Sequence, residues 1–281
     1  MLPDNQESFD LMFDEAFATH AVEKGATVVS ILPDWNGSRS IMAIPNCILR
    51  SGLFSATRGS GKVFMKRVPI KTISGISIVY TGMRLTQTDL DVWHGILSLS
   101  KIQFDPELVD MSAKSFLRMI GRSGGKSDRE WLKNSVAKMS ATTIEISHGE
   151  ITYGGSLIDE FYRDEATGRY KLKLNRKLAN LFTPAAWTAI DWNQRSALQG
   201  KPLALWLHAF YSSHRAAFDY KVETIMALCG GEDGDVFLFR RRLKAALDEL
   251  NNTIKWSCSY NKGCDTISVA RSTSPTPLPV E

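Results

Sequence analysis

The sequence lacks any uncharged apolar run of about 18 residues, and its N-terminus, Met1–Asn5, lacks the basic and then apolar pattern of a secretion signal. We therefore expect no membrane span and no export, and we place the protein in the cytoplasm. Cysteine is scarce, and no C-x-x-C pair is present, which argues against a disulfide framework, a zinc ribbon or a redox site. Reduced thiols are expected at Cys47, Cys229, Cys258 and Cys264.

Signatures of several enzyme classes are also missing. The five histidines include no His-x-His pair, so the metal site of a rolling-circle nicking enzyme is absent. The loop Gly59–Lys62 has neither the spacing of a Walker-type phosphate loop nor the Ser or Thr that follows its lysine. Ser212–His214 has no nucleophile elbow around it, which favours a turn after a helix over a catalytic pair. We predict no enzymatic activity, no cofactor and no metal site.

The composition, 43% hydrophobic and 23% charged, is that of an ordinary globular protein. The net charge of +4 is unevenly distributed, because residues 1–50 carry seven acids against three bases and the remainder therefore has a net charge of +8. An acidic head thus precedes a basic body. This asymmetry suggests a polyanion as partner, although such a charge is also common in proteins that bind none.

Hydrophobic spacing predicts a three-helix unit in the first half. One helix begins after Thr86 or Thr88, and a second covers Met111–Ile120. A third runs from a capping box at Ser127–Glu130 to about Met139. Around this unit, β-branched and alternating residues predict strands within Val63–Tyr80, broken at Pro69 and Gly75, and over Thr142–Ser147, Glu150–Tyr162 and Arg169–Leu174.

The same order returns in the second half. Helices are expected over Leu203–Ser212, Lys221–Leu228 and Val236–Asn251, and strands over Thr253–Tyr260 and Thr266–Ala270. Helices followed by a hairpin, twice over, predict an α+β fold of two tandem winged-helix domains. We expect a flexible acidic arm over 1–37, the first domain over 38–183, the second over 184–271, and a disordered tail over 272–281.

The last helix of each unit is the candidate recognition helix, because in helix-turn-helix folds this helix enters the major groove. At about 100° per residue, Phe239, Leu243, Ala246, Leu247 and Leu250 form one buried arc. Arg241 and Lys244 point away from that arc, and Arg240 lies at its edge. These cations are candidate DNA contacts.

The earlier helix has the same design. It is expected to bury Trp131, Leu132, Val136 and Met139 and to expose Lys133 and Asn134, with Arg129 at the edge and Lys126 in the preceding loop. Arginine pairs with guanine and asparagine with adenine, whereas lysine more often contacts phosphate. The alternative is a solvated helix face, since Glu130, Asp248 and Glu249 are nearby. The repetition of the arrangement favours DNA binding.

The predicted hairpin of the first unit, its wing, adds Arg163, Arg169, Lys171 and Lys173. Alternation with Tyr170, Leu172 and Leu174 places both lysines on the solvent face of a strand, where they could follow a phosphate backbone. Solubilising charge is the alternative interpretation.

Several spaced motifs, in order, resemble the TrfA family of plasmid replication initiators over residues 35–271. They are Arg39–Asn46, Arg50–Ser51, Leu53–Phe54, Tyr80–Gly82, Leu85, Asp89, Val92–Trp93, Phe210–Arg215, Leu228–Gly230 and the helix Leu243–Leu250. The resemblance implies a tandem winged-helix protein that binds direct repeats, called iterons, in double-stranded plasmid origin DNA. It also implies opening of an adjacent AT-rich element, with single-stranded origin DNA as a further candidate ligand, and recruitment of the host initiator ATPase and replicative helicase. A homodimer in the absence of DNA is a further candidate state.

The family also carries a sliding-clamp-binding peptide before its first domain. The nearest match here is Ser8–Phe13, in which Phe9, Asp10, Leu11 and Phe13 would bind the clamp, although Ser8 stands where the family has glutamine. The alternative is that these side chains pack onto the domain. For the whole chain, the competing function is a winged-helix transcriptional repressor that binds an operator, since a fold does not determine a function.

Overall fold

The computed structural model describes residues 41–57, 63–73, 76–102, 108–148, 150–175, 177–178, 181, 186–216, 218–231 and 234–271. The expected acidic arm, its clamp-binding residues and the C-terminal tail lie outside this range. None of the helices formed by the described residues is long and apolar enough to cross a bilayer. The prediction of a mixed fold of helices and strands is confirmed.

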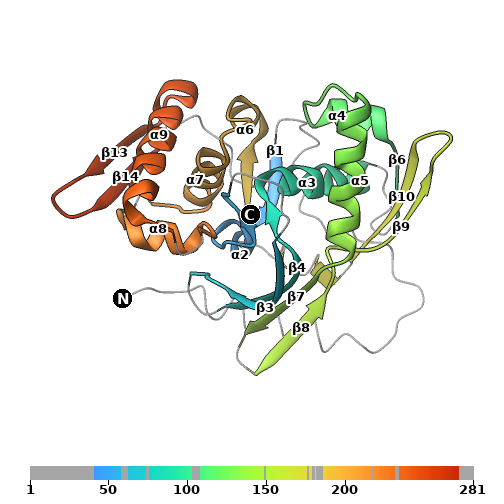
Figure 1. Cartoon of the computed structure of the whole chain (residues 1–281), viewed down its shortest axis with the longest axis horizontal. Helices are drawn as coiled ribbons and strands as arrows, with labels where there is room; N and C mark the ends of the chain where they lie inside the picture. Colours follow the sequence, from blue (N-terminus) through green and yellow to red (C-terminus); the bar gives the residue numbers. More distant parts are fainter. Residues whose placement is uncertain are drawn as a thin grey trace, which may run out of the picture.

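The first half is built around one cluster of buried apolar side chains. Its elements are β1 (Ile41–Pro45), α2 (Asn46–Leu49), β2 (Phe54–Ser55), β3 (Phe64–Ile70), β4 (Ser77–Met83), β5 (Leu85–Thr86), α3 (Gln87–Ile102), β6 (Leu108–Ser112), α4 (Ala113–Met119), α5 (Lys126–Ser140), β7 (Thr143–His148), β8 (Ile151–Gly155), β9 (Ile158–Asp164) and β10 (Arg169–Leu174). Helices α3, α4 and α5 pack beside a three-stranded sheet of order β6-β10-β9, and a four-stranded sheet of order β3-β4-β7-β8 lies next to them (Figure 1).

The second half has its own buried cluster. Its elements are β11 (Trp187–Asp191), α6 (Trp192–Ala197), α7 (Pro202–Ser212), β12 (Tyr220–Lys221), α8 (Val222–Leu228), α9 (Val236–Ile254), β13 (Ser257–Asn261) and β14 (Thr266–Ala270). The sheet order is β12-β14-β13, so the strand before the last two helices pairs with the last strand, as it does in the first half. The two halves therefore share the order helix, strand, helix, helix and a final pair of strands, with β7 and β8 inserted before that pair in the first half.

Several contacts join the halves, including a strand pair, a buried hydrogen bond and a buried ion pair. Strand β11 pairs antiparallel with β1 from Trp187 opposite Pro45 to Asp191 opposite Ile41. The indole Nε1 of Trp206 on α7 donates to the carbonyl oxygen of Ser51 at 3.0 Å. The buried Arg195 of α6 pairs with Asp91 of α3, from Nε to Oδ1 at 2.6 Å. The two candidate recognition helices, α5 and α9, therefore belong to halves that are joined directly to each other.

The predicted strand Glu150–Tyr162 is wrong, because two strands of different sheets occupy it. Strand β8 pairs with β7, whereas β9 pairs with β10. The chain changes sheets at Ser156, whose carbonyl accepts a hydrogen bond from the Asn175 amide at 2.7 Å, and Leu157 and Ile158 then enter the core. Only the β9–β10 hairpin occupies the position of the expected wing.

Two element boundaries and one predicted strand break also differ from the prediction. Met111 is not helical, because it lies in strand β6 opposite Tyr170, and α4 begins only at Ala113. Pro69 does not break a strand, because β3 is an edge strand where a missing N–H is tolerated. Helix α9 continues past the predicted Asn251 to the buried Ile254, and the following left-handed Lys255 delays the strand to Ser257.

Candidate nucleic-acid interface

Helix α5 does not begin with the predicted capping box. Its first residue is Lys126, and the residue before it, Gly125, provides no side-chain cap. Asp128 instead accepts hydrogen bonds from the Ser123 hydroxyl at 2.6 Å, the Gly124 N–H at 3.1 Å and the Arg122 guanidinium at 3.0 Å. The Ser123 hydroxyl, followed by Arg122, lowers the pKa of Asp128. A carboxylate that reaches back to the loop therefore replaces the Ser127–Glu130 pair.

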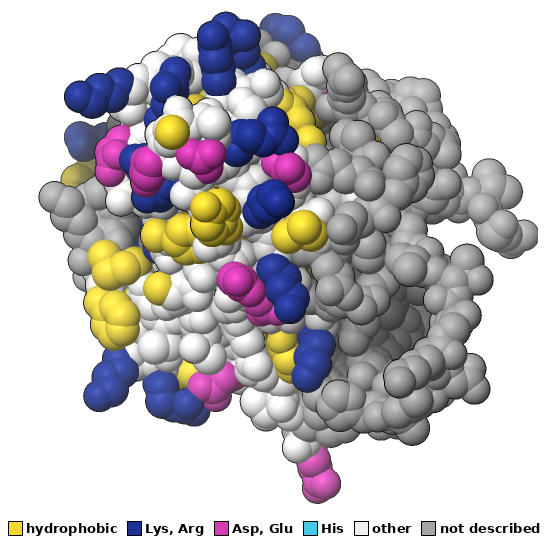
Figure 2. All heavy atoms as spheres, turned by 90° about the vertical axis from the view of Figure 1, so that its right-hand side faces the viewer, with side chains coloured by type: hydrophobic (Ala, Val, Ile, Leu, Met, Phe, Trp, Pro, Cys, Tyr) yellow, Lys and Arg dark blue, Asp and Glu magenta, His cyan; other side chains and the backbone are white. Residues whose placement is uncertain are grey.

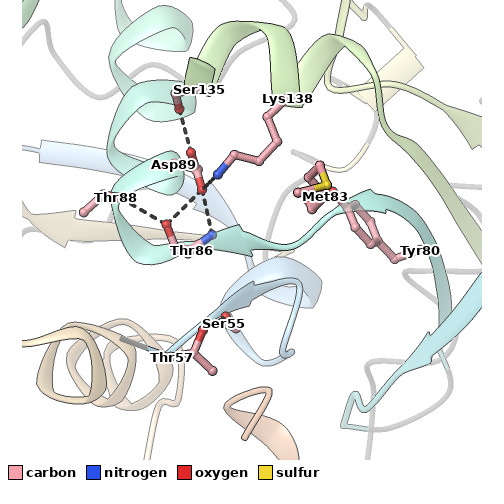
Figure 3. A network of polar contacts seen from close by, with 9 residues as sticks. All are labelled: Ser55, Thr57, Tyr80, Met83, Thr86, Thr88, Asp89, Ser135 and Lys138. Carbon is pink, nitrogen blue, oxygen red and sulfur yellow. Dashed lines mark hydrogen bonds and ion pairs between the residues drawn. The ribbon is translucent and has the colours of Figure 1, made fainter. Parts of the chain in front are cut away.

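A buried carboxylate holds α5 against α3 (Figure 3). The Oδ1 atom of Asp89 accepts from the Ser135 hydroxyl at 2.6 Å, and its Oδ2 atom accepts from the Lys138 ammonium at 2.6 Å. Oδ2 also accepts from the Thr86 N–H at 2.8 Å, which caps α3 and confirms that the helix begins after Thr86. Since Ser135 and Lys138 lie on the inner side of α5, this network fixes which side of the helix faces outward.

The outward side of α5 carries most of the predicted contacts. Asn134 is exposed, as predicted, whereas Lys133, also predicted to be exposed, is half-buried. Arg129, predicted at the edge, is exposed, and so is Lys126, which is the first residue of the helix and not part of the preceding loop. Trp131, predicted as core, is also only half-buried, because its ring lies under the Arg122 guanidinium at 3.5 Å. The helix thus exposes two cations and one amide, although the Nε atom of Arg129 also donates to the Gly124 carbonyl oxygen at 3.1 Å.

Lys133 and Arg163 share one carboxylate in the turn between β9 and β10. The Lys133 Nζ atom lies 2.9 Å from Glu165 Oε2, and the Arg163 Nε atom donates to Glu165 Oε1 at 2.6 Å. These two cations, Lys133 first, lower the pKa of Glu165. Both predicted DNA contacts are therefore neutralised within the chain, so a phosphate must compete with Glu165 for them.

We expect Glu165→Gln to tighten DNA binding about two- to fivefold at low salt, because it frees both cations and removes a charge that repels phosphate. The logarithmic salt slope should also steepen by about one. Asp159→Asn, which makes the same charge change near the start of β9, is the control and should leave affinity unchanged. Unaltered affinity of Glu165→Gln in a fluorescence anisotropy titration would place this turn away from the DNA.

The outer face of the β6-β10-β9 sheet is electrically balanced. Tyr170, Leu172 and Leu174 are buried and Lys171 and Lys173 exposed, as the alternation predicts. The outward cations Arg169, Lys171 and Lys173 lie beside the outward carboxylates Asp110, Glu160 and Asp164 in the strand register. Arg169 binds Asp110 at 2.7 Å. On this side of the molecule, basic and acidic side chains intermingle with apolar ones (Figure 2), so the carboxylates offset part of the charge with which these cations could attract phosphate.

Helix α9 has the clearest basic face. Its N-cap, Asp235, accepts from the Phe237 N–H at 2.8 Å, and the predicted arc from Phe239 to Leu250 is buried. Arg241 and Lys244 are exposed, as predicted, and the Lys244 ammonium lies 4.4 Å from the centre of the Tyr260 ring. The positions that face away from the core are therefore free to meet a partner.

Arg240 is not free, because it forms two hydrogen bonds with Asp265 in the turn between β13 and β14, at 2.9 and 2.7 Å. The Arg240 guanidinium lowers the pKa of Asp265. In both halves, then, a carboxylate of the hairpin turn binds a cation of the last helix. Sequence reasoning missed these acidic partners, since pairing across separate elements leaves no local signal.

Two exposed apolar residues of α9, Phe237 and Leu238, were also missed. The helical periodicity that identified Arg241 places both of them outside the buried arc, so their exposure could have been predicted from the sequence. Among the described residues no group of three or more His, Cys, Asp or Glu side chains could hold a metal ion.

Comparison with known proteins gives relatives in sequence and in fold. The family model described as TrfA protein matches residues 22–261. The plasmid replication initiator protein TrfA of Escherichia coli is 23% identical over 223 residues, which are 76% of this chain and 58% of that protein. The chain thus spans somewhat more than half the length of this curated relative.

Solved structures of RctB share the fold at low identity. Domains 2–3 of RctB align with a TM-score of 0.53 and 12% identity over 81% of this chain and 97% of that chain. A selenomethionine derivative of the same two domains gives 0.52 and 10% over 75% and 94%. The Pi initiator protein in complex with iteron DNA gives 0.49 and 11% over 70% and 98%. Because the family model covers most of the sequence, the chain belongs to the TrfA family.

Proposed function

We propose that this chain is a plasmid replication initiator that binds direct repeats in a plasmid origin through two winged-helix domains, residues 38–183 and 184–271. The observation that carries the proposal is the repeated arrangement of a basic last helix and a hairpin within a chain of the TrfA family. Helix α5 packs on α3 and α4, and α9 packs on α6, α7 and α8. The β9–β10 hairpin comes later in the chain than α5, and the β13–β14 hairpin directly follows α9. This is the arrangement with which winged-helix proteins place a helix in the major groove.

The two helices divide the proposed contacts. From α9, Arg241 is proposed to contact a base edge and Lys244 a phosphate, and Arg240 is proposed to contribute once it leaves Asp265. From α5, Arg129 and Asn134 are candidates for base contacts, and Lys126 and Lys133 for phosphate. The hairpin residues Arg163, Arg169, Lys171 and Lys173 are assigned a smaller share, because nearby carboxylates offset their charge.

The proposal extends to the steps that family membership suggests. These are opening of the AT-rich element next to the repeats, contact with the released single strand, and recruitment of the host initiator ATPase, replicative helicase and sliding clamp. None of them requires covalent chemistry by this chain. A homodimer that gives way to a DNA-bound monomer belongs to the same proposal.

The test is a binding titration against direct repeats from the protein's own plasmid origin and against a scrambled duplex, at two salt concentrations. We expect a preference of about a thousandfold or more for the repeats. Equal and steeply salt-dependent binding to both duplexes would instead indicate a nonspecific DNA-bridging protein. Tight repeat binding without opening of the adjacent element, detected with permanganate, would favour a transcriptional repressor.

The Arg241→Ala, Lys244→Ala variant is expected to lose most repeat binding. A base-contacting arginine contributes about 1 to 3 kcal/mol, and removal of one phosphate contact lowers the salt slope by about one. Both side chains are exposed, so the fold should persist. The control is Lys66→Ala, Lys71→Ala, which removes two exposed cations outside the recognition elements. Anisotropy titrations that give the same affinity for both double variants would remove α9 from the interface.

A further inference from the structure

Two large apolar side chains stand exposed on the first turn of α9. Phe237 is 70% exposed and Leu238 is 46% exposed. They do not extend the core, which begins at the next residue, Phe239. The capping bond from the Phe237 N–H to Asp235 holds the backbone of this turn in place. An ordered, solvent-facing apolar pair of this kind indicates a contact surface.

The neighbours of this pair identify its partner. Residues three and four apart on a helix lie side by side, so Phe237 adjoins Arg241, and Leu238 adjoins both Arg241 and Arg242. These arginines are exposed, as is Lys244 one turn further on. The first carboxylate after Asp235 in α9 is Asp248, beyond this group. A surface that is apolar at its tip and cationic along its next turn complements a polyanion that also offers apolar groups.

Double-stranded DNA offers such groups in one place. Thymine alone among the four bases carries a methyl group on its major-groove edge, and apolar side chains discriminate in its favour. The N-terminal residues of a recognition helix are those that approach base edges. Phe237 and Leu238 are on the first turn of α9, and Arg241 follows on the second.

We propose that Phe237 and Leu238 contact thymine methyl groups in each repeat and thereby determine part of the sequence that the second half recognises. The inference rests on the proposed function, and it names the side chains that would distinguish thymine from the other bases. Phe237 is the main specificity determinant, because it lies in line with Arg241 and is the more exposed of the two.

Deoxyuridine substitution tests the contact, because uracil differs from thymine only in lacking the methyl group. Each thymine of the repeat is replaced singly by deoxyuridine, and affinities are measured for the wild-type chain and for Phe237→Ala. At one or two positions the wild-type chain should lose about fourfold in affinity, as expected for one buried carbon. Phe237→Ala should bind the unmodified repeat more weakly and should lose nothing further at the same positions.

Two controls separate this contact from other causes. Phe64→Ala removes a comparably exposed phenylalanine, 62% exposed, from β3, and it should retain the wild-type response to deoxyuridine. Arg241→Ala should weaken binding and keep the response. If the wild-type chain prefers repeats over a scrambled duplex and yet no deoxyuridine position weakens it, the methyl contact is wrong while the proposed function stands. Equal losses in wild-type and Phe237→Ala at every position would also overturn it.

Discussion

Lowering the pH from 7 to 5 is expected to reduce the free energy of unfolding by several kcal/mol, because three histidines are buried in their neutral form. Burial lowers the pKa of His94 and of His208 to about 3 and that of His214 to about 4, from an ordinary 6.5. Positive neighbours act in the same direction: Arg195 near His94 and His208, and Arg50 near His214.

The sign follows from proton uptake. Below pH 6.5 the unfolded chain binds protons at these histidines, whereas the folded chain does not until pH falls to about 4 or 3. The contribution of these histidines to the free energy of unfolding is therefore fully present above pH 6.5. It declines as the pH falls from 6.5 towards 4 and 3. Each histidine contributes a loss of about 1 kcal/mol per pH unit.

Urea unfolding at pH 7, 6 and 5 measures this decline. His94→Gln removes one of the three groups while its amide can still meet the Ser98 hydroxyl, which lies 3.0 Å from the His94 ring nitrogen. In this variant the free energy of unfolding should depend less steeply on pH, because unfolding then takes up about one proton fewer. Equal stability at pH 7 and pH 5 in the wild-type chain would mean that these histidines are accessible to protons in the folded state.

Local periodicity was enough to predict the faces of α9 and β10. The arc from Phe239 to Leu250 and the alternation around Leu172 depend only on helix or strand geometry, and both are observed. The capping box at Ser127 had an equally clear local pattern and is wrong, because Asp128 competes for the same loop. Local patterns therefore predict which side chains face outward more reliably than which hydrogen bonds they form.

Contacts between distant segments could not be predicted from the sequence. The run Gly154–Gly155–Ser156 is typical of a break and could have divided the predicted strand. Which sheet each part joins depends on Asn175 and on pairing with β7, and these contacts leave no local signal. In the same way, the charge pattern identified Lys133 and Arg240 as candidate DNA contacts, yet Glu165 and Asp265 reach them only after the hairpins fold back. The free charge of the interface is consequently smaller than the sequence indicates.

Arg195→Ala is expected to cost about 3 to 5 kcal/mol of stability, the range for breaking a buried ion pair. Arg195 is 1% exposed, and its partner Asp91 is 7% exposed. Its guanidinium also donates to the Gln87 carbonyl oxygen at 3.0 Å and to the Gln87 side-chain oxygen at 3.2 Å. Removal of the arginine leaves a buried carboxylate without its counter-charge. Urea unfolding measures the loss, and Arg169→Ala, which breaks the exposed pair with Asp110, should cost at most about 1 kcal/mol.

The position of this pair links stability to DNA recognition. Helix α3 carries Asp89, which holds α5, and two residues later Asp91, which holds α6 through Arg195. Since α6 packs on α9, helix α3 connects the two proposed recognition helices, α5 directly and α9 through α6. The Asp91→Leu, Arg195→Met variant replaces the pair with apolar side chains and should recover much of the stability lost in Arg195→Ala. If its repeat affinity also recovers, the pair acts through the fold; if stability returns while affinity remains low, the charged pair sets the orientation of the two halves on DNA.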